Sequence, residues 1–427
     1  MRDLPEILGD LAAGPYPEYI DDVLVRSAAV RQRPAWTFPE RWIPMADTVR
    51  LPAAVPRLPW RAIFLASLLI ALLLAAAVAL NVGTPLRLPA PFGVAKSGLV
   101  AYDAGGDLFT ADPVTGAATA ILTGPEQDHG PRFSLDGRYL AFERWLAGDQ
   151  REIYVARADG RGLTLVTPKP VTLAPAEVGR EWETYKFSPD GRTLLIATQT
   201  AGVPGLSLAQ TDGSGMRVLD VGMPAAEGSF RPPDGTEVLF IGTKAGNRGL
   251  FALNVAKGTV RPILELLPGF DLAGPSWSPD GSRIAYWTWG GEAEGMNARS
   301  HVVLADGTAD RELPSPAGAV WNAHATWSND GTRLFIARGY TPGNEDVRGA
   351  VLPADGSSVG IEIAPAGSVE TACCAAWIWS PDDKLLLGRS TFRGGSATQL
   401  LLDASGGPVR PAPWSASGDP AWQRLAP

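Results

Sequence analysis

Trp277-Ser-Pro-Asp-Gly281 is one of six copies of a short motif that organises the chain from residue 133 onward. Successive motif aspartates are 44 to 54 residues apart. A period of about 40–50 residues with strand-like flanks is typical of a β-propeller, in which each repeat supplies one four-stranded blade. The other copies are Phe133-Ser-Leu-Asp-Gly137, Phe187-Ser-Pro-Asp-Gly191, Phe230-Arg-Pro-Pro-Asp-Gly235, Trp327-Ser-Asn-Asp-Gly331 and Trp379-Ser-Pro-Asp-Asp383.

Each copy predicts a hairpin. Proline presets φ at the first central position of the turn, aspartate tolerates the second, and glycine takes the left-handed position that follows. An alternating apolar strand comes next, such as Ile284-Ala-Tyr286. The motif aspartates could be metal ligands or turn residues, and their recurrence in every copy favours turn chemistry. The recurring aromatic residue is expected to pack between blades.

Two fragments at the ends of the domain complete the count. Residues 98–122 contain three strand patterns without a motif strand, and Pro420-Ala-Trp422 resembles a motif strand with no strand after it. Joined, they make one more blade, and a ring closed by both ends leaves no free sheet edge. We therefore expect an all-β, seven-bladed β-propeller over residues 97–427, with six blades as the alternative.

The motif hairpin, the strand after it and the later Asp-Gly turn resemble the repeats of TolB-like propellers, over roughly residues 92–427. The resemblance implies a protein-binding platform, often extracytoplasmic in bacteria, with no shared catalytic residues. Some peptidases carry such a propeller as well. Two copies depart from the pattern: one has an extra residue at Pro232-Pro233, and the last has Asp383 in place of glycine.

An apolar run predicts a membrane span. Residues 62–82 are almost wholly apolar, and at ~1.5 Å per residue they cover about 30 Å, the thickness of the hydrocarbon core. Arg50, Arg57 and Arg61 precede the run, whereas Arg87 and Lys96 follow it, which favours a cytoplasmic N-terminus. We expect a cytoplasmic segment at 1–59, a transmembrane helix at 60–82, a Pro-rich linker at 83–96 and an extracytoplasmic propeller in the cell membrane. The rival interpretations are a buried core helix and a cleaved signal peptide, and the sixty residues before the run argue against the second.

The charge balance of the chain limits which partners it is expected to bind. The chain has 37 Lys and Arg against 45 Asp and Glu, and the excess of acid lies beyond the apolar run. This balance argues against nucleic acid as a partner.

The two cysteines, Cys373 and Cys374, are adjacent and cannot form an ordinary disulfide framework. Two interpretations stay open, a vicinal disulfide and a pair of small buried residues.

Residues 17–33 predict an amphipathic helix in the cytoplasmic segment. Its apolar face could meet a protein partner, lie on the membrane surface or be loosely ordered. The arrangement is loosely similar to the inner arm of transmembrane anti-sigma regulators, although the zinc-binding His/Cys motif of many such regulators is absent here.

A binding site is expected where the loops that enter the innermost strands surround one mouth of the central channel. A ring of carboxylates there would bind a cation or the basic end of a peptide, and its oxygens would suit calcium. The alternative is that each acid caps local loop amides. No catalytic residue, resident metal or other cofactor is predicted. The candidate residues are Asp128, His129, Glu181, Glu183, Glu227, Asp271, Asn322, His324 and Asp419.

From these features we expect a single-pass membrane protein that displays a propeller outside the cytoplasm and binds a protein or peptide without catalysis. A transmembrane signal transducer, with the propeller as sensor and residues 1–59 as effector, is the alternative. A hydrolase or lyase that uses the channel mouth is a third hypothesis.

Overall fold

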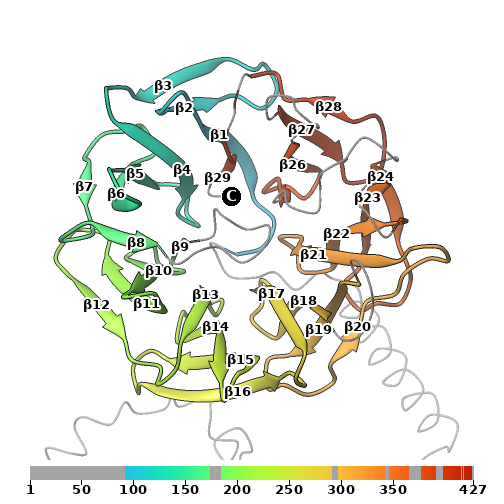
Figure 1. Cartoon of the computed structure of the whole chain (residues 1–427). Coiled ribbons are helices and arrows are strands. Elements are labelled where there is room, and N and C mark those ends of the chain that lie inside the picture. Colours follow the sequence, from blue (N-terminus) through green and yellow to red (C-terminus); the bar gives the residue numbers. More distant parts are fainter. Residues whose placement is uncertain are drawn as a thin grey trace, which may run out of the picture. The chain divides into compact units, whose positions relative to one another are not determined.

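A computed structural model shows antiparallel sheets arranged around a central axis (Figure 1). It describes residues 92–173, 184–290, 297–341, 346–364, 377–390, 398–414, 416 and 418–425. Within these ranges the chain forms 29 strands and no α-helix. The described residues therefore contain no helix that could cross a membrane. The predicted segments at 1–59 and 60–82, most of the 83–96 linker, and Cys373 and Cys374 lie outside the described residues.

One sheet joins the two ends of the domain. Its strand order is β29-β1-β2-β3, and β29 is antiparallel to β1 through the pairs Val100–Trp422 and Ala101–Ala421. The last strand of the chain thus completes the sheet that the first three strands begin, as the sequence predicts. The strands are β29 (Ala421–Leu425), β1 (Lys96–Ala104), β2 (Asp107–Ala111) and β3 (Ala118–Leu122).

The next sheet has nine strands and contains two sets of four. Strand β8 pairs with both β6 and β10 and thereby connects the sets. The first set is β4 (Gln127–Phe133), β5 (Tyr139–Trp145), β6 (Gln150–Arg157) and β7 (Thr164–Leu165), followed by β8 (Val171–Leu173). The second set is β9 (Tyr185–Phe187), β10 (Thr193–Thr200), β11 (Val203–Gln210) and β12 (Met216–Leu219).

Four more sheets have four strands each, in chain order. They are β13 (Ala225–Phe230), β14 (Glu237–Lys244), β15 (Asn247–Asn254) and β16 (Thr259–Glu265); β17 (Phe270–Trp277), β18 (Arg283–Gly290), β19 (Arg299–Leu304) and β20 (Arg311–Glu312); β21 (Trp321–Trp327), β22 (Arg333–Gly339), β23 (Val347–Pro353) and β24 (Ile361–Ala364); and β25 (Trp377–Trp379), β26 (Leu385–Ser390), β27 (Thr398–Asp403) and β28 (Arg410–Pro411).

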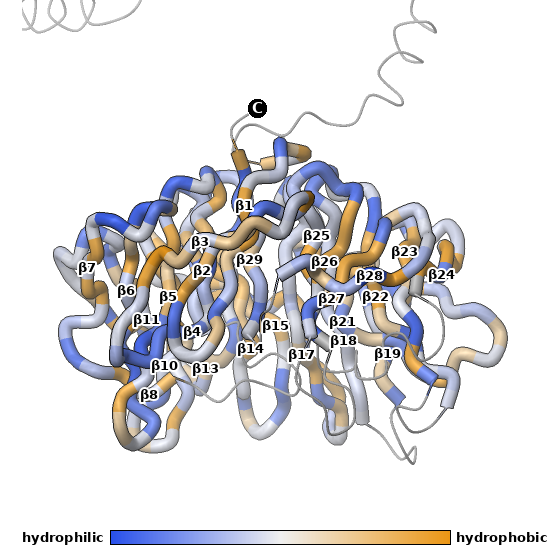
Figure 2. The backbone as a smooth tube through the Cα atoms, turned by 90° about the horizontal axis from the view of Figure 1, so that it is seen from above, coloured by the Kyte–Doolittle hydropathy of each residue, from blue (hydrophilic) through white to orange (hydrophobic). Residues whose placement is uncertain are grey.

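The core lies between neighbouring sheets. One cluster joins Leu239 and Leu250 of one sheet to Ile284 and Tyr286 of the next, all of them buried. Apolar stretches follow the strands, whereas polar stretches follow many of the connections (Figure 2). Because each sheet is apolar on both faces, it needs a neighbour on each side, which is why the fold forms a ring.

The motif aromatics pack between sheets, as the repeat predicts. Trp327 donates its indole N–H to Ser276 O at 3.1 Å, across to the preceding sheet. The guanidinium of Arg283 lies 5.0 Å from the Trp327 ring centroid, and Arg333 lies 4.9 Å from that of Trp379. These cation–π contacts repeat from one sheet to the next and hold each motif strand against its neighbour.

Candidate functional site

The regular motif turn is a closed set of local hydrogen bonds. In Ser278–Gly281, the Ser278 hydroxyl donates to Asp280 Oδ1 at 2.5 Å and accepts from Arg283 N at 2.9 Å. Asp280 Oδ1 also accepts from Ser282 N at 3.1 Å, and Gly281 has φ +68°. Burial alone would raise the pKa of Asp280, but the bonds from Ser278 and Ser282 outweigh it and the net shift is downward. The aspartate is therefore a turn residue.

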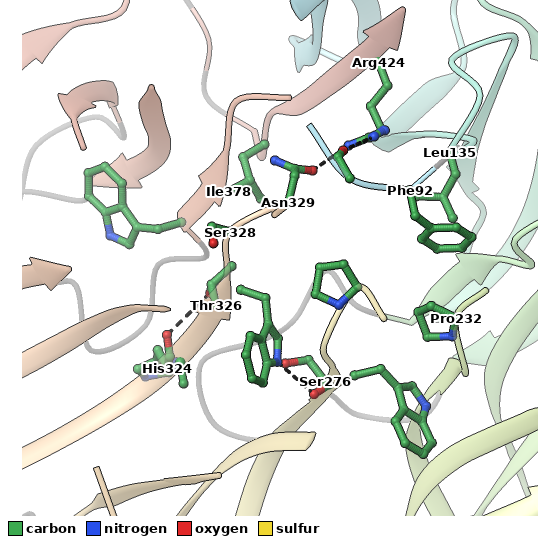
Figure 3. A pocket seen from close by; sticks show the side chains of 16 residues that line it. Phe92, Leu135, Pro232, Ser276, His324, Thr326, Ser328, Asn329, Ile378 and Arg424 are labelled. Atoms are coloured by element: carbon green, nitrogen blue, oxygen red, sulfur yellow. Dashed lines mark hydrogen bonds between the residues drawn. The ribbon is translucent and has the colours of Figure 1, made fainter. Parts of the chain in front are cut away.

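A cavity of about 320 Å³ lies at the end of the channel where these turns converge (Figure 3). Its lining comes from several sheets, including the third motif position of four different turns, which places it on the axis of the ring. Those four residues are Leu135, Pro232, Pro279 and Asn329. A second cavity of about 300 Å³ shares Asn329, Ile378 and Arg424 with the first.

Two departures from the motif meet beside this cavity. Asn329 stands where four other copies have proline, and Asp383 stands where the others have glycine. Asp383 Oδ1 accepts from the backbone N–H and from the side-chain amide of Asn329, both at 2.7 Å. Its other oxygen accepts from Asp330 N at 2.9 Å. Burial raises the pKa of Asp383, and the bonds from Asn329 and Asp330 only reduce that shift.

Arg424 of β29 completes the group. It donates to Asn329 Oδ1 at 2.5 Å and to the carbonyl oxygen of Gly93, and Figure 3 shows Arg424 and Asn329 joined at the cavity. Burial lowers the pKa of Arg424, and the charge of Asp383 opposes that shift. Within the described part of the chain, no carboxylate forms an ion pair with Arg424. A partly buried cation held by neutral acceptors is thus present in the channel wall.

The second cavity has both basic and acidic side chains in its lining. The second cavity is lined by Arg132, Lys186 and Arg424 with one carboxylate, Asp419. This contrasts with the formal net charge of −8 of the whole chain. Of these side chains, Arg424 has neutral partners, so its charge can pair with an anionic ligand.

Three indole N–H groups are buried in the walls of the two cavities. Trp277 and Trp377 line the first cavity and Trp422 the second. Their Nε1 atoms are buried and have no acceptor among the described residues. Since these nitrogen atoms are buried, a ligand in either cavity does not reach them without a rearrangement of the walls.

Several predicted site residues are engaged with other parts of the protein. Asp128 accepts a two-point contact from Arg144, at 2.7 and 2.9 Å, and Asp271 lies 2.9 Å from Arg248. Asn322 is fully buried, accepts from Ser300 N at 2.5 Å and donates to Ser315 Oγ at 2.6 Å. These pairings satisfy the side chains within the fold.

Glu227 and His324 occupy equivalent positions in their strands. Each lies at a bulge of its innermost strand, with φ +41° and +61°, where β17 has Gly274. Glu227 Oε2 accepts from Gly274 N of the next sheet at 2.9 Å, whereas His324 lines the first cavity. Left-handed backbone is costly for residues with a side chain, and bulges are frequent near binding sites.

His129 lies in a separate cluster at the start of β4. Its Nδ1 is 3.1 Å from Asp103 Oδ2, and its ring centroid is 4.1 Å from that of Trp145. Glu143, opposite His129 in the β4–β5 register, has a pKa raised by burial. Of the predicted residues, only His324 and Asp419 line the axial cavities, and Glu181 and Glu183 lie outside the described residues.

No group of three or more His, Cys, Asp or Glu side chains that could hold a metal occurs in the described ranges. With Asp128 and Asp271 bound to arginines, those two carboxylates do not converge on an ion. A calcium ion at the mouth stays a prediction. Sequence reasoning missed Arg424, Asn329 and Asp383. The two motif departures were the available indication, because a position that breaks a repeated rule serves something other than the repeat.

Comparisons with known proteins support the fold. No family model and no curated protein matches the chain. An oligogalacturonate lyase in complex with manganese is similar in structure, with a TM-score of 0.55 and 16% identity over 74% of this chain and 85% of that one. A prolyl endopeptidase gives a TM-score of 0.51 and 13% identity over 75% of this chain and half of the other. TolB from Acinetobacter baumannii gives 0.46 and 15% over 78% and 81%.

The fold is therefore that of a β-propeller. Its structural neighbours are TolB-like and other propeller proteins, and at these identities the likeness shows the fold alone. The expectation of a non-catalytic membrane protein that binds a protein or peptide is wrong, because the neighbours include a lyase and peptidases. That expectation carried a function over from a fold, and one fold hosts many unrelated functions.

Proposed function

We propose that the chain is a seven-bladed propeller whose central channel binds a small molecule through a carboxylate group. Arg424 is the observation that carries this proposal. It lies on the channel wall with two neutral acceptors and no ion-paired carboxylate among the described residues. A guanidinium pairs with a carboxylate in a two-point contact, and such charge-assisted bonds are about twice as strong as neutral ones.

The blade count rests on the sheets. Five sheets have four strands each, and the nine-stranded sheet contains two further sets of four, β4–β7 and β9–β12. In this arrangement β8 is an additional pairing between two blades. The ring is closed by β29, which also carries Arg424.

The other side chains that line the first cavity indicate the size and polarity of the ligand. Phe92, Leu135, Pro232 and Ile378 give the first cavity an apolar surface. A volume of about 320 Å³ lies at the lower end of the range of small-molecule sites. These walls favour an organic acid with an apolar body.

An acidic sugar is the second candidate. The similar oligogalacturonate lyase is named for an acidic oligosaccharide, which adds this class to the test. Both candidates share the carboxylate that Arg424 would bind.

Calorimetry on the full-length protein tests the proposal with two acids and their neutral counterparts. The probes are 4-phenylbutyrate against 4-phenylbutanol, and galacturonate against galactose. We expect at least one acid to bind and its neutral counterpart to bind about 10- to 100-fold more weakly, as the loss of a charge-assisted contact requires. The tighter acid decides between the two classes.

Arg424→Gln should weaken the acid to the level of its neutral counterpart. The matched control is Arg138→Gln, since Arg138 is an exposed motif-turn arginine with 73% side-chain exposure. Near-UV circular dichroism checks that both variants stay folded. Equal binding of acid and neutral probe, or no binding of any probe, would refute the proposal.

The membrane span at 60–82 and the extracytoplasmic location of the propeller stay predictions, as does the absence of nucleic-acid binding. Protease added to intact spheroplasts should digest the propeller and spare an N-terminal tag if the orientation is as expected. Loss of the tag would reverse it.

A further inference from the structure

We infer that Asn329 and Asp383 are positioning residues that hold Arg424 ready for one carboxylate of a channel ligand. This inference rests on the proposed function and adds to it how the site is built and what it selects. The residues come from three different sheets, on β29 and on the turns after β21 and β25. Their meeting is therefore a property of the closed ring.

The amide orientation of Asn329 follows from its partners. One amide nitrogen donates both to Asp383 Oδ1 at 2.7 Å and to the carbonyl oxygen of Ser380 at 2.9 Å. Since both of its protons have acceptors, the amide oxygen is the atom left to face Arg424. Asp383 thus orients Asn329, and Asn329 orients Arg424.

This geometry restrains Arg424 without neutralising it. An aspartate at position 329 would form an ion pair with the guanidinium and compete with a ligand for it. The neutral amide instead accepts one N–H, and Gly93 O accepts another. A guanidinium has five N–H donors, so up to three are available for a ligand carboxylate.

Asp383 also carries a backbone cost that the other copies of the motif avoid. Asp383 has φ +57° at the position where the other five copies have glycine at φ +68° to +71°. Left-handed backbone disfavours residues with a side chain, so glycine would relax this turn. Asp383 thus has a carboxylate where glycine would give a less strained backbone, and this carboxylate bonds to Asn329 and Asp330 of another sheet.

The charge of Asp383 makes the site selective for a single negative charge. The side-chain amide of Asn329 lies between the Asp383 carboxylate and Arg424, and Asp383 is buried. A monoanion pairs with the guanidinium, whereas a dianion such as a phosphate monoester adds repulsion from Asp383. The ligand class is therefore a monocarboxylate.

Restoring the repeat tests this assignment. Asp383→Gly and Asn329→Pro recreate the regular motif, so each should fold, with some stability lost because the hydrogen bonds between the two residues are removed. Both should nevertheless bind the acid probe identified above at least tenfold more weakly. Asn329→Asp, which is nearly isosteric, should weaken the acid probe and leave its neutral counterpart unchanged. Asp383→Asn keeps an acceptor and should recover part of the affinity.

The outcomes separate the two proposals. If the wild type and both restored variants bind the acid equally, the positioning role is refuted while the carboxylate site stands. If Arg424→Gln also binds like the wild type, the site itself is refuted. Phenyl phosphate is the dianion control, and binding as tight as that of the monocarboxylate would overturn the selectivity.

Discussion

The regular motif turn at Ser278–Gly281 and the altered turn at Ser380–Asp383 have the same shape and different uses. In the regular turn, the carboxylate of Asp280 bonds to Ser278 and Ser282, its own neighbours. In the altered turn, Asp382 makes the same local bond to Ser380, whereas Asp383 reaches a turn of another sheet. A repeat protein thus keeps its fold in the positions that obey the repeat and places its specific contacts in the positions that depart from it.

Removing the closing strand β29, which carries Arg424, should have the largest effect. Deleting residues 418–427 removes β29, exposes the edge of β1 and loses the buried Trp422. The free energy of unfolding should fall by about 4 kcal/mol or more, the scale of losing a buried tryptophan together with a strand ladder. Chemical denaturation measures it, and deletion of 426–427 alone is the control. An unchanged midpoint would contradict ring closure by β29.

Adding a side chain in the regular turn and removing one at the same position of the altered turn should have different effects on stability. Gly281→Ala places a Cβ 2.0 Å from Pro232 O at φ +68°, so it should cost about 2–3 kcal/mol. Asp383→Gly should cost less than about 1 kcal/mol, because relaxed backbone offsets the lost hydrogen bonds. Denaturant midpoints of the two variants provide the measurement. Equal destabilisation would mean that the altered turn is an ordinary member of the repeat.

The hydrogen bonds of the Ser278 hydroxyl should contribute less to the free energy of unfolding than the left-handed backbone position of Gly281. Ser278→Ala removes a buried hydroxyl that serves both Asp280 and Arg283 N. We expect a loss of about 1–2 kcal/mol, typical of leaving a buried donor unpaired. Thermal unfolding of this variant beside an exposed control, Ser405→Ala, measures the difference. Identical shifts in the two variants would show that the motif serine is dispensable.

The two kinds of aspartate should respond to pH with opposite sign, which is the smallest expected effect. The pKa of Asp280 is lowered in the fold, so its contribution to stability is present above the unfolded value of 3.8 and is lost as pH falls through the folded pKa. The pKa of Asp383 is raised, so its folded form binds the proton more tightly and stability falls as pH rises through the folded pKa.

Asp280→Asn should therefore destabilise the protein near neutral pH more than at about pH 2. The stability of Asp383→Asn should increase relative to that of the wild type as pH rises from about 3 to 7, since the substitution removes the buried charge. Unfolding curves across this range check both signs. Parallel pH profiles for the two variants would contradict the difference between the turns.

The sequence by itself determined the repeat and its local chemistry. The hairpin turns, the glycine positions and the inter-sheet role of the motif aromatics all follow from residues within a few positions of one another, where bond geometry is decided locally. The pairing of Pro420–Trp422 with the first strands was also predictable, because the ring has unpaired edges without it.

Only the tertiary structure decided which distant side chains meet. It joined Asp128 to Arg144 and Asp271 to Arg248, so that these acids do not form the open ring that their loop positions suggested. It also brought Arg424, Asn329 and Asp383 together from positions 54 and 95 residues apart. Their contact depends on the closure of the ring and on the number of sheets around its axis, and neither quantity is encoded in any one repeat.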